Sequence, residues 1–394
     1  MAAGWFLCFR FPLMWVITGI GEPNRPFLDL HALLVARDAV RLGMDPATSN
    51  PLDPYNRPFI YTTWWLAFPS WGLGRKDTIW LGAGCVLLLL VTALAWLRPR
   101  SWRDGVVAGV VLLSPAFLLA ANRANHDIIV FVMVSLGLVC FRRKEAAWQA
   151  LGVMTFAVAA VLKYYPLVTL LLLLELRPGR RLWTGFALYA AVLLLAWPGL
   201  AAAFASASRN SPTPEWLYAF GAPILWRNFA STSQLGWVVL GAVALAGAAV
   251  MAWNSERFRA DLSAGTPAAE REFICGAVML VGVFFLGASY AYKLIFALWM
   301  IPWLRQPPVE AGERRWRLVT WGLLLTALWL EGLAAITVNL VAAPDSARAL
   351  LVLKAALFGS NVVDWILIAC LMRFLFVYVG RLGREFLAGR TVQP

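Results

Sequence analysis

The stretch TIWLGAGCVLLLLVTALAWL, residues 78–97, decides the fold class of this chain because no charged residue interrupts it. An α-helix rises about 1.5 Å per residue, so about 20 apolar residues cross a hydrocarbon core about 30 Å thick. A second run, LVTWGLLLTALWLEGLAAITV at 318–338, has Glu331 as its only ionisable residue. Both stretches predict membrane-spanning helices.

The composition of the whole chain agrees with this prediction. Of its 394 residues, 61% are hydrophobic and 14% are charged, whereas soluble domains carry about 25% charged residues. A soluble globular enzyme is therefore excluded. We expect an all-α fold, a polytopic transmembrane helical bundle in which residues 1–394 form a single integral-membrane domain.

Apolar runs predict about twelve spans. The predicted spans are 4–20, 78–97, 105–121, 127–141, 146–163, 165–176, 182–200, 234–253, 273–291, 293–304, 318–338 and 350–376. The first could imitate a signal peptide, but it ends in Ile20-Gly21-Glu22-Pro23 without a small-x-small cleavage site. We therefore interpret it as an uncleaved span.

The basic residues orient these spans. With both termini in the cytoplasm, most of the 34 Lys and Arg residues fall in internal loops, as the positive-inside rule requires. Arg98 to Arg103 stay inside only if the aromatic stretch 59–74 does not cross, so we expect an interfacial or re-entrant helix there. Residues 21–77 are then one large extracytoplasmic loop, which also carries an amphipathic helix over 30–42. The excess of Arg over Lys suggests a GC-rich bacterial genome, and we expect the protein in a bacterial cytoplasmic (inner) membrane.

The net charge of +13 does not indicate nucleic-acid binding, because the basic residues lie in small clusters between apolar runs. The five cysteines lie inside apolar runs without Cys-x-x-Cys spacing, and there are only two histidines. We therefore predict no nucleic-acid partner, no metal site and no cofactor, and expect membrane lipids as partners.

Two predicted spans are short, and each begins beside a lysine. Residues 165–176 and 293–304 would measure about 18 Å as α-helices, which places Lys163 and Lys293 below the outer headgroups. A cation in such a partly desolvated cavity can bind a lipid phosphate. The alternative is that either lysine snorkels to the interface.

The turn Asn122-Arg123-Ala124-Asn125-His126-Asp127 concentrates polar groups on the same outer face and is expected to line the same cavity. Asn125 or Asp127 could instead cap the following helix. Arg123 has no such alternative, because a capped turn does not need it. His126 could act as a general base or as a hydrogen-bonding group.

Asp29 lies in the outer loop, where a carboxylate could deprotonate a sugar hydroxyl. It immediately precedes the amphipathic helix, so it could instead be an N-cap. Glu331, Lys354 and Asp364 lie inside predicted spans, where ionisable residues are usually functional. They support an alternative function, a transporter or flippase of lipid-linked cell-envelope intermediates. A non-catalytic assembly partner of an envelope synthase is a further alternative.

Several short motifs resemble those of a known enzyme family. The matching pieces are Asp29-Leu30, Gly43-Met44-Asp45-Pro46, Phe59-Ile60-Tyr61, Asn125, Lys163-Tyr164-Tyr165-Pro166 and the segment 289–302. Together they resemble the GT-C glycosyltransferases that use polyprenyl-phosphate sugars, and among these the polyprenol-phosphate-mannose-dependent alpha-mannosyltransferases of glycosyltransferase family 87.

The resemblance implies a GT-C fold and inverting transfer of a sugar, mannose in this family, from a polyprenyl-phosphate donor to an extracytoplasmic glycolipid or glycan acceptor. Asp29 matches the position of the catalytic base. The other implied roles are donor-phosphate binding by Lys293, Arg123, Lys163 and Arg227, and substrate binding by Asn125, His126, Tyr61 and Tyr292. The chain departs from the family at Tyr292-Lys293, where members commonly carry a histidine, and at Tyr61-Thr62-Thr63, where they have Tyr-Pro-Pro.

Overall fold

The computed structural model of the chain consists of helices and one very short strand pair. It describes residues 26–67, 72–176, 179–210, 218–229, 235–253, 267–287, 289–306, 311–341 and 347–387. The predicted first span, 4–20, lies outside the described residues. Two-residue strands β1 (Ala219–Phe220) and β2 (Ser289–Tyr290) pair antiparallel.

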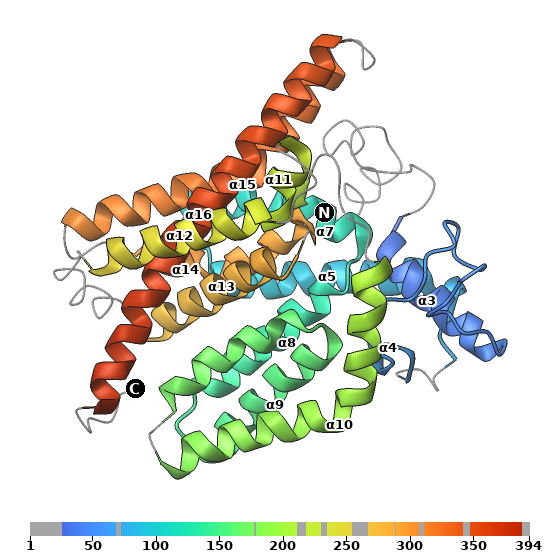
Figure 1. The fold of residues 1–394 in the computed structure, drawn as a ribbon, viewed down its shortest axis with the longest axis horizontal. Helices are drawn as coiled ribbons and strands as arrows, with labels where there is room; N and C mark the ends of the chain where they lie inside the picture. The colour runs from blue at the N-terminus through green and yellow to red at the C-terminus, as the bar shows by residue number, and fades with distance from the viewer. Residues whose placement is uncertain are drawn as a thin grey trace.

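The other regular elements of the described chain are helices (Figure 1). Their bounds are α3 (Leu28–Arg41), α4 (Trp64–Ala67), η1 (Arg75–Asp77), α5 (Thr78–Leu97), α6 (Trp102–Leu112), α7 (Pro115–Arg123), α8 (Asp127–Phe141), α9 (Ala146–Leu162), η2 (Tyr165–Glu175), α10 (Arg180–Asn210), α11 (Ala222–Phe229), α12 (Leu235–Trp253), α13 (Pro267–Leu286), η5 (Ala291–Trp299), α14 (Ile301–Leu304), α15 (Ala311–Val341) and α16 (Ala347–Leu387). The η elements are 3₁₀ helices.

Four helical stretches in the described residues are long and apolar enough to cross a membrane. They are Arg75–Leu97, Arg180–Asn210, Arg314–Val338 and Ala349–Arg384. The pair α6 and α7 makes a fifth if the two count as one span. The chain is thus an all-helical protein of multi-pass membrane type, while the count of about twelve spans and the orientation remain predictions.

The predicted span 105–121 is broken. Its two parts, α6 and α7, are bent by 60° at Ser114 and Pro115. Pro115 has no N–H to continue a helix, and Ser114 caps α7 by accepting the N–H of Phe117. A helix-breaking pair therefore divides this apolar run.

The two short predicted spans also differ from expectation: 165–176 folds as the 3₁₀ helix η2, and 293–304 is divided between the 3₁₀ helix η5 and the short α-helix α14. At about 2.0 Å per residue, the 11 residues of η2 reach about 22 Å, which is still less than the hydrocarbon core. The predicted interfacial helix over 59–74 contains only α4, whereas residues 68–71 are not described. Pro166 and Pro302 lie in the first turns of η2 and α14, where a helix tolerates proline because the missing N–H would have no partner in the helix.

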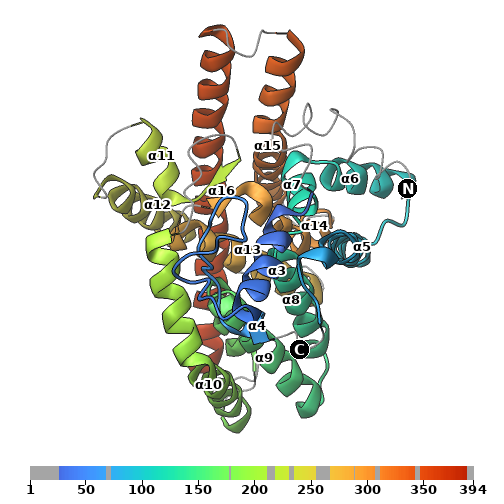
Figure 2. The same cartoon turned by 90° about the vertical axis from the view of Figure 1, so that its right-hand side faces the viewer.

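Helix α3 corresponds to the predicted amphipathic helix and ends before Gly43, whose φ of +74° suits glycine. Its N-cap, Phe27, donates its backbone N–H to the carbonyl oxygen of Asn122 over 2.8 Å. This bond attaches the start of α3 to the last turn of α7. Figures 1 and 2 show α3 and the adjoining loop gathered at one end of the bundle, beside the upper part of α10.

Candidate active site

Asp127 is the centre of a buried ionic group. As the first residue of α8, it forms ion pairs with Lys163 through Oδ1 at 2.6 Å and with Lys293 through Oδ2 at 2.8 Å. The hydroxyl of Tyr165 also donates to Oδ1. Two segments distant in sequence, the junction between α9 and η2 and the start of η5, thus converge on one carboxylate.

Local backbone structure accounts for this convergence. Lys163 is the C-cap of α9 in an extended conformation, and Pro166 prevents that helix from continuing. Lys293 lies in the first turn of η5, directly after strand β2. Both lysines are buried, with relative exposures of 8% and 5%, so snorkelling to the surface is wrong for both within this structure.

Asn125 links this group to a second carboxylate. Its side-chain N–H donates to Oδ2 of Asp29 at 2.5 Å, and its Oδ1 accepts from Lys163 Nζ at 3.3 Å. The guanidinium of Arg123 donates to the same Oδ2 of Asp29 at 3.0 Å. One amide side chain therefore spans the gap between Asp29 and a lysine that neutralises Asp127.

The capping alternative for Asp29 is wrong. Phe27 is the N-cap of α3 and makes no side-chain capping bond, and Asp29 lies inside the first turn. In the described part of the chain, no hydrogen bond reaches Oδ1 of Asp29. The carboxylate is thus held by one oxygen, with the other left to accept a proton.

The capping alternative for Asn125 is correct in part, since its Oδ1 also accepts the backbone N–H of Asp127 at 2.9 Å. The amide therefore stabilises the start of α8 as well as linking the two carboxylates. His126 is the N-cap residue by position and makes no side-chain capping bond.

Burial and the neighbouring cations act in opposite directions on Asp29. Burial raises the pKa of its carboxyl, but the charge of Arg123 and the hydrogen bonds from Arg123 and Asn125 outweigh it. The pKa of Asp29 therefore lies below its ordinary value of 3.8. Asp29 is ionised at any ordinary pH, in the state that a base requires.

His126 is poorly suited to proton transfer. Its ring packs against Tyr61 and Trp65, at centroid distances of 4.4 and 5.1 Å, and neither ring nitrogen has a hydrogen-bond partner in the described residues. Burial, followed by the charge of Lys163, lowers the pKa of His126 to about 3. His126 is thus a neutral packing residue beneath Tyr61.

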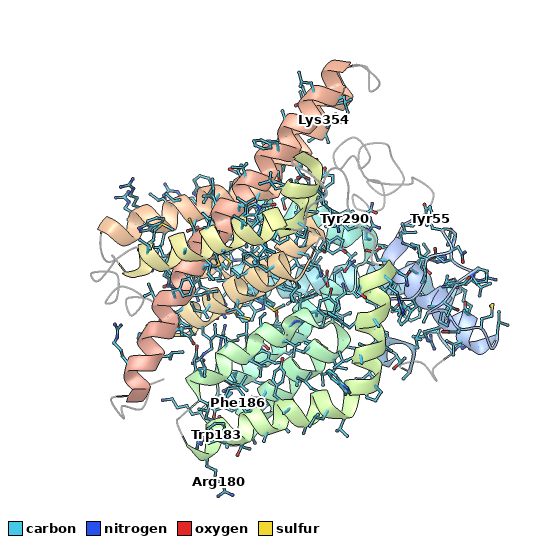
Figure 3. The ribbon with its side chains drawn as sticks, viewed as in Figure 1. Tyr55, Arg180, Trp183, Phe186, Tyr290 and Lys354 are labelled. Atoms are coloured by element: carbon cyan, nitrogen blue, oxygen red, sulfur yellow. The ribbon has the colours of Figure 1, made fainter. Side chains whose placement is uncertain are left out.

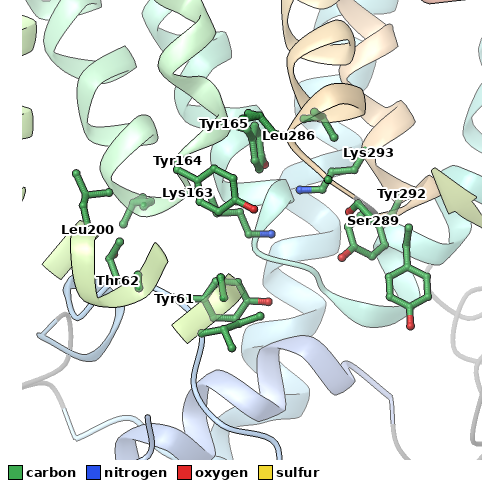
Figure 4. Close-up of a pocket in the computed structure, with 17 residues that line it drawn as sticks. Tyr61, Thr62, Lys163, Tyr164, Tyr165, Leu200, Leu286, Ser289, Tyr292 and Lys293 are labelled. Carbon is green, nitrogen blue, oxygen red and sulfur yellow. The ribbon is translucent and has the colours of Figure 1, made fainter. Parts of the chain in front are cut away.

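A cavity of about 110 Å³ opens beside the two lysines (Figure 4). Figure 4 shows the Lys163 and Lys293 side chains reaching toward the same space, between Tyr165 and Tyr61. The polar side chains that line the cavity are Tyr61, Thr62, Lys163, Tyr164, Tyr165, Ser289, Tyr290, Tyr292 and Lys293. A larger cavity of about 560 Å³ shares Tyr61 with the first and is mostly apolar.

The structure brings together eight of the nine predicted site residues. The cavity or the ionic group contains Asp29, Tyr61, Arg123, Asn125, Lys163, Tyr292 and Lys293, with His126 packed beneath. Arg227 differs, because it is exposed on α11 and none of the described contacts joins it to this group. The prediction for Arg227 therefore has no support in the site geometry.

The sequence analysis placed Asp127 in the cavity-lining turn and Tyr165 in a motif, but it assigned neither residue a role in the site. Asp127 is the only charged residue of α8, and it is fully buried at the start of an otherwise apolar helix. Its isolation in the sequence was the available signal, since two lysines in short spans need a counter-charge. Asp127, Asp29, Arg123, Lys163 and Lys293 are called the charged cluster below.

The residues of the transporter alternative lie elsewhere. Glu331 on α15 and Asp364 on α16 are buried, at 4% and 3% exposure. Lys354 is exposed on the projecting end of α16 (Figure 3). The three do not form one polar group, and in the described residues no cluster of three His, Cys, Asp or Glu side chains could hold a metal ion.

Comparison with known proteins gave similarity at the level of structure. No family model matches the chain, and no curated protein matches it. The chain is similar to the structure of ArnT from Cupriavidus metallidurans in the apo state, with 18% identity, a TM-score of 0.37, and coverage of 98% of this chain and 77% of that one. For ArnT bound to undecaprenyl phosphate the identity is 17%, the TM-score 0.35, and the coverage 98% and 78%. Such TM-scores do not establish a common fold, so function has to be inferred from the side chains of the site.

Proposed function

We propose that this protein is a membrane glycosyltransferase of GT-C type that transfers a sugar from a polyprenyl-phosphate donor with inversion. In keeping with the motif resemblance to family 87, the proposed sugar is mannose and the acceptor an extracytoplasmic glycolipid or glycan. One observation carries the proposal: Asn125 connects a half-free carboxylate, Asp29, to a pair of buried lysines that face a cavity.

The charge of the site supports a phosphate ligand. The charged cluster holds three cations and two carboxylates, 3 − 2 = +1, which complements the single negative charge of a sugar phosphodiester. Each ammonium has three donor hydrogens, and Lys293 uses one of them on Asp127. Both lysines can thus bind a phosphate while Asp127 still orients them.

The proposed reaction begins when the acceptor hydroxyl gives its proton to Oδ1 of Asp29. The acceptor oxygen then attacks the anomeric carbon from the face opposite the phosphate, and a new glycosidic bond forms. The bond between that carbon and the phosphate oxygen breaks, and its electron pair leaves with the polyprenyl phosphate. Lys163, Lys293 and Arg123 stabilise the additional negative charge.

Asp29→Asn tests the proposal, because the amide keeps the shape but cannot accept the proton. We expect transfer from a radiolabelled polyprenyl-phosphate mannose to fall by about 10²- to 10⁴-fold, with the protein still folded and inserted. The matched control is Asp38→Asn on the same helix, whose carboxylate pairs with Arg41 near the surface. Near-normal turnover by Asp29→Asn would refute the role of Asp29 as the base.

A further inference from the structure

Glu331 is a buried carboxylate that the proposed reaction does not use, and its contact is with the backbone of a distant segment. Its Oε2 accepts the N–H of Tyr218, and the hydroxyl of Ser360 also forms a hydrogen bond with it. Tyr218 immediately precedes β1, so α15 holds the start of this strand. The contact lies outside the charged cluster.

Tyr218 has an unusual backbone for a residue with a side chain. Its φ of +64° lies in the left-handed region, which a non-glycine residue adopts only when surrounding contacts enforce it. Its carbonyl oxygen accepts the N–H of Ala291 at 2.7 Å. Both backbone groups of Tyr218 are thus engaged, one by Glu331 and the other by the segment that carries Lys293.

The segment after β2 is the part of the active site that this connection controls. In the β1–β2 pair, Ala219 lies opposite Tyr290 and Phe220 opposite Ser289. The guanidinium of Arg123 lies over the ring of Tyr290, 5.0 Å from its centroid. Lys293, two residues after Ala291, pairs with Asp127. One short strand therefore supports two of the three cations of the charged cluster.

Strands of two residues need support from outside, because an isolated two-stranded pair is marginal even when longer. On one side, Ala219 and Ile224 pack against Leu357 of α16 in a small buried cluster. The other support is the Glu331 carboxylate at the start of β1. Both come from the α15 and α16 pair, which crosses the length of the bundle (Figure 2).

We infer that Glu331 is a positioning residue, which fixes Lys293 for phosphate binding by holding Tyr218 and, through it, the β1–β2 pair. The inference rests on the proposed function, since it assigns Lys293 to the donor phosphate. For this role the side chain of Glu331 must be long enough to bring an acceptor oxygen from α15 to the N–H of Tyr218. Its negative charge is not required for this role.

Two substitutions in the full-length protein in lipid nanodiscs separate the effect of side-chain length from the effect of side-chain charge. Glu331→Gln keeps the length and an acceptor oxygen but loses the charge, whereas Glu331→Asp keeps the charge and shortens the reach. We expect the KM for a polyprenyl-phosphate sugar to stay within about twofold in Glu331→Gln. In Glu331→Asp it should rise roughly tenfold, the size of effect expected when a buried N–H loses its hydrogen-bond acceptor. Asp364→Asn is the matched control, because Asp364 is buried nearby without a described hydrogen bond to Tyr218.

Direct binding of a short-chain prenyl phosphate, measured on the same variants and on Lys293→Ala, separates two kinds of failure. If Lys293→Ala weakens binding but Glu331→Asp does not, the positioning role is refuted and the phosphate site stands. If neither weakens binding, the phosphate site fails and the positioning role with it. Greater loss in Glu331→Gln than in Glu331→Asp would overturn the inference in favour of a role for the charge.

Discussion

Two buried ionic groups occupy different parts of the bundle, and they differ in how their charges balance. The charged cluster joins α3, α7, α8, α9 and η5. The second group, called the arginine clamp, joins the start of α13 to its neighbours. Its pairs are Glu175 with Arg271, Glu270 with Arg381, and Glu272 with Arg142.

In the arginine clamp every carboxylate has its own guanidinium, 3 − 3 = 0, and the hydroxyl of Tyr378 donates a further bond to Glu175. The charged cluster has two ammonium groups on one carboxylate and an excess of one positive charge beside a cavity. A buried ion pair that is complete in itself needs no ligand, whereas an excess charge in a desolvated cavity favours a counter-ion. Surplus charge next to a cavity, and not burial of charge alone, therefore distinguishes a binding site from a structural clamp.

The two groups should also lie on opposite sides of the membrane, and this gives an all-or-none test. Thr48→Cys and Arg75→Cys, both exposed positions, should react with a membrane-impermeant thiol reagent in intact cells because residues 21–77 are predicted to be extracytoplasmic. Lys144→Cys, exposed on the clamp side, should react only after permeabilisation. Labelling of Lys144→Cys in intact cells would show that this side is extracytoplasmic and contradict the predicted topology. Labelling of Thr48→Cys without Arg75→Cys would mean that the chain crosses the membrane between these two positions.

The sequence predicted the long regular helices well and the broken ones poorly. Helix α5 has the predicted bounds of 78–97, because an uninterrupted apolar run has no other stable form in lipid. The division at Ser114 and Pro115 and the 3₁₀ form of η2 and η5 were not predicted. They depend on backbone geometry at prolines and on packing against other helices, which apolar length does not encode.

The site was predicted as a list of residues and not as a network. Lys163 and Lys293 were found because lysine is rare in short apolar runs, and Asp29 because a carboxylate precedes the amphipathic helix. Their mutual contacts join positions 29, 125, 163 and 293, and no local spacing in the sequence records which carboxylate receives which cation. Asp127 was underestimated for the same reason, because its position at a helix start has an ordinary explanation as a capping residue.

The largest effect on catalysis after loss of Asp29 should come from Lys293. We expect Lys293→Ala to lower transfer by about 10- to 100-fold, because it removes a cation from the leaving phosphate and leaves Asp127 with one partner fewer. Lys293→Arg keeps the charge but not the compact shape, and should retain part of the activity. Equal rates for Lys293→Ala and the parent would show that the charge excess of the cluster has no catalytic use.

A smaller effect, a shift in pH dependence, should follow from Arg123→Ala. In the parent the pKa of Asp29 lies below 3.8, so the base stays ionised and transfer should not fall on the acidic side until the pH approaches that value. Without Arg123, burial raises the pKa of Asp29 and the largest group opposing it is lost, so the acidic limb of the pH–rate profile should move up by about one pH unit or more. An unmoved limb would mean that another group sets the acidic limit, and Asp38→Asn again serves as the control.

The smallest effect on transfer should come from the arginine clamp, where the expected loss is in stability. Arg381→Gln removes the partner of Glu270 on α13 and leaves a largely buried carboxylate with a weaker donor, which should cost roughly 1–3 kcal/mol of stability. Since the clamp holds no surplus charge, kcat and the KM for the donor should both stay within about twofold when measured below the lowered melting temperature. Thermal unfolding of the detergent-solubilised protein, followed beside steady-state kinetics, separates the two quantities. A raised KM in Arg381→Gln with an unchanged melting temperature would contradict the distinction between the groups, because the neutral clamp would then act on the substrate as the charged cluster is proposed to do.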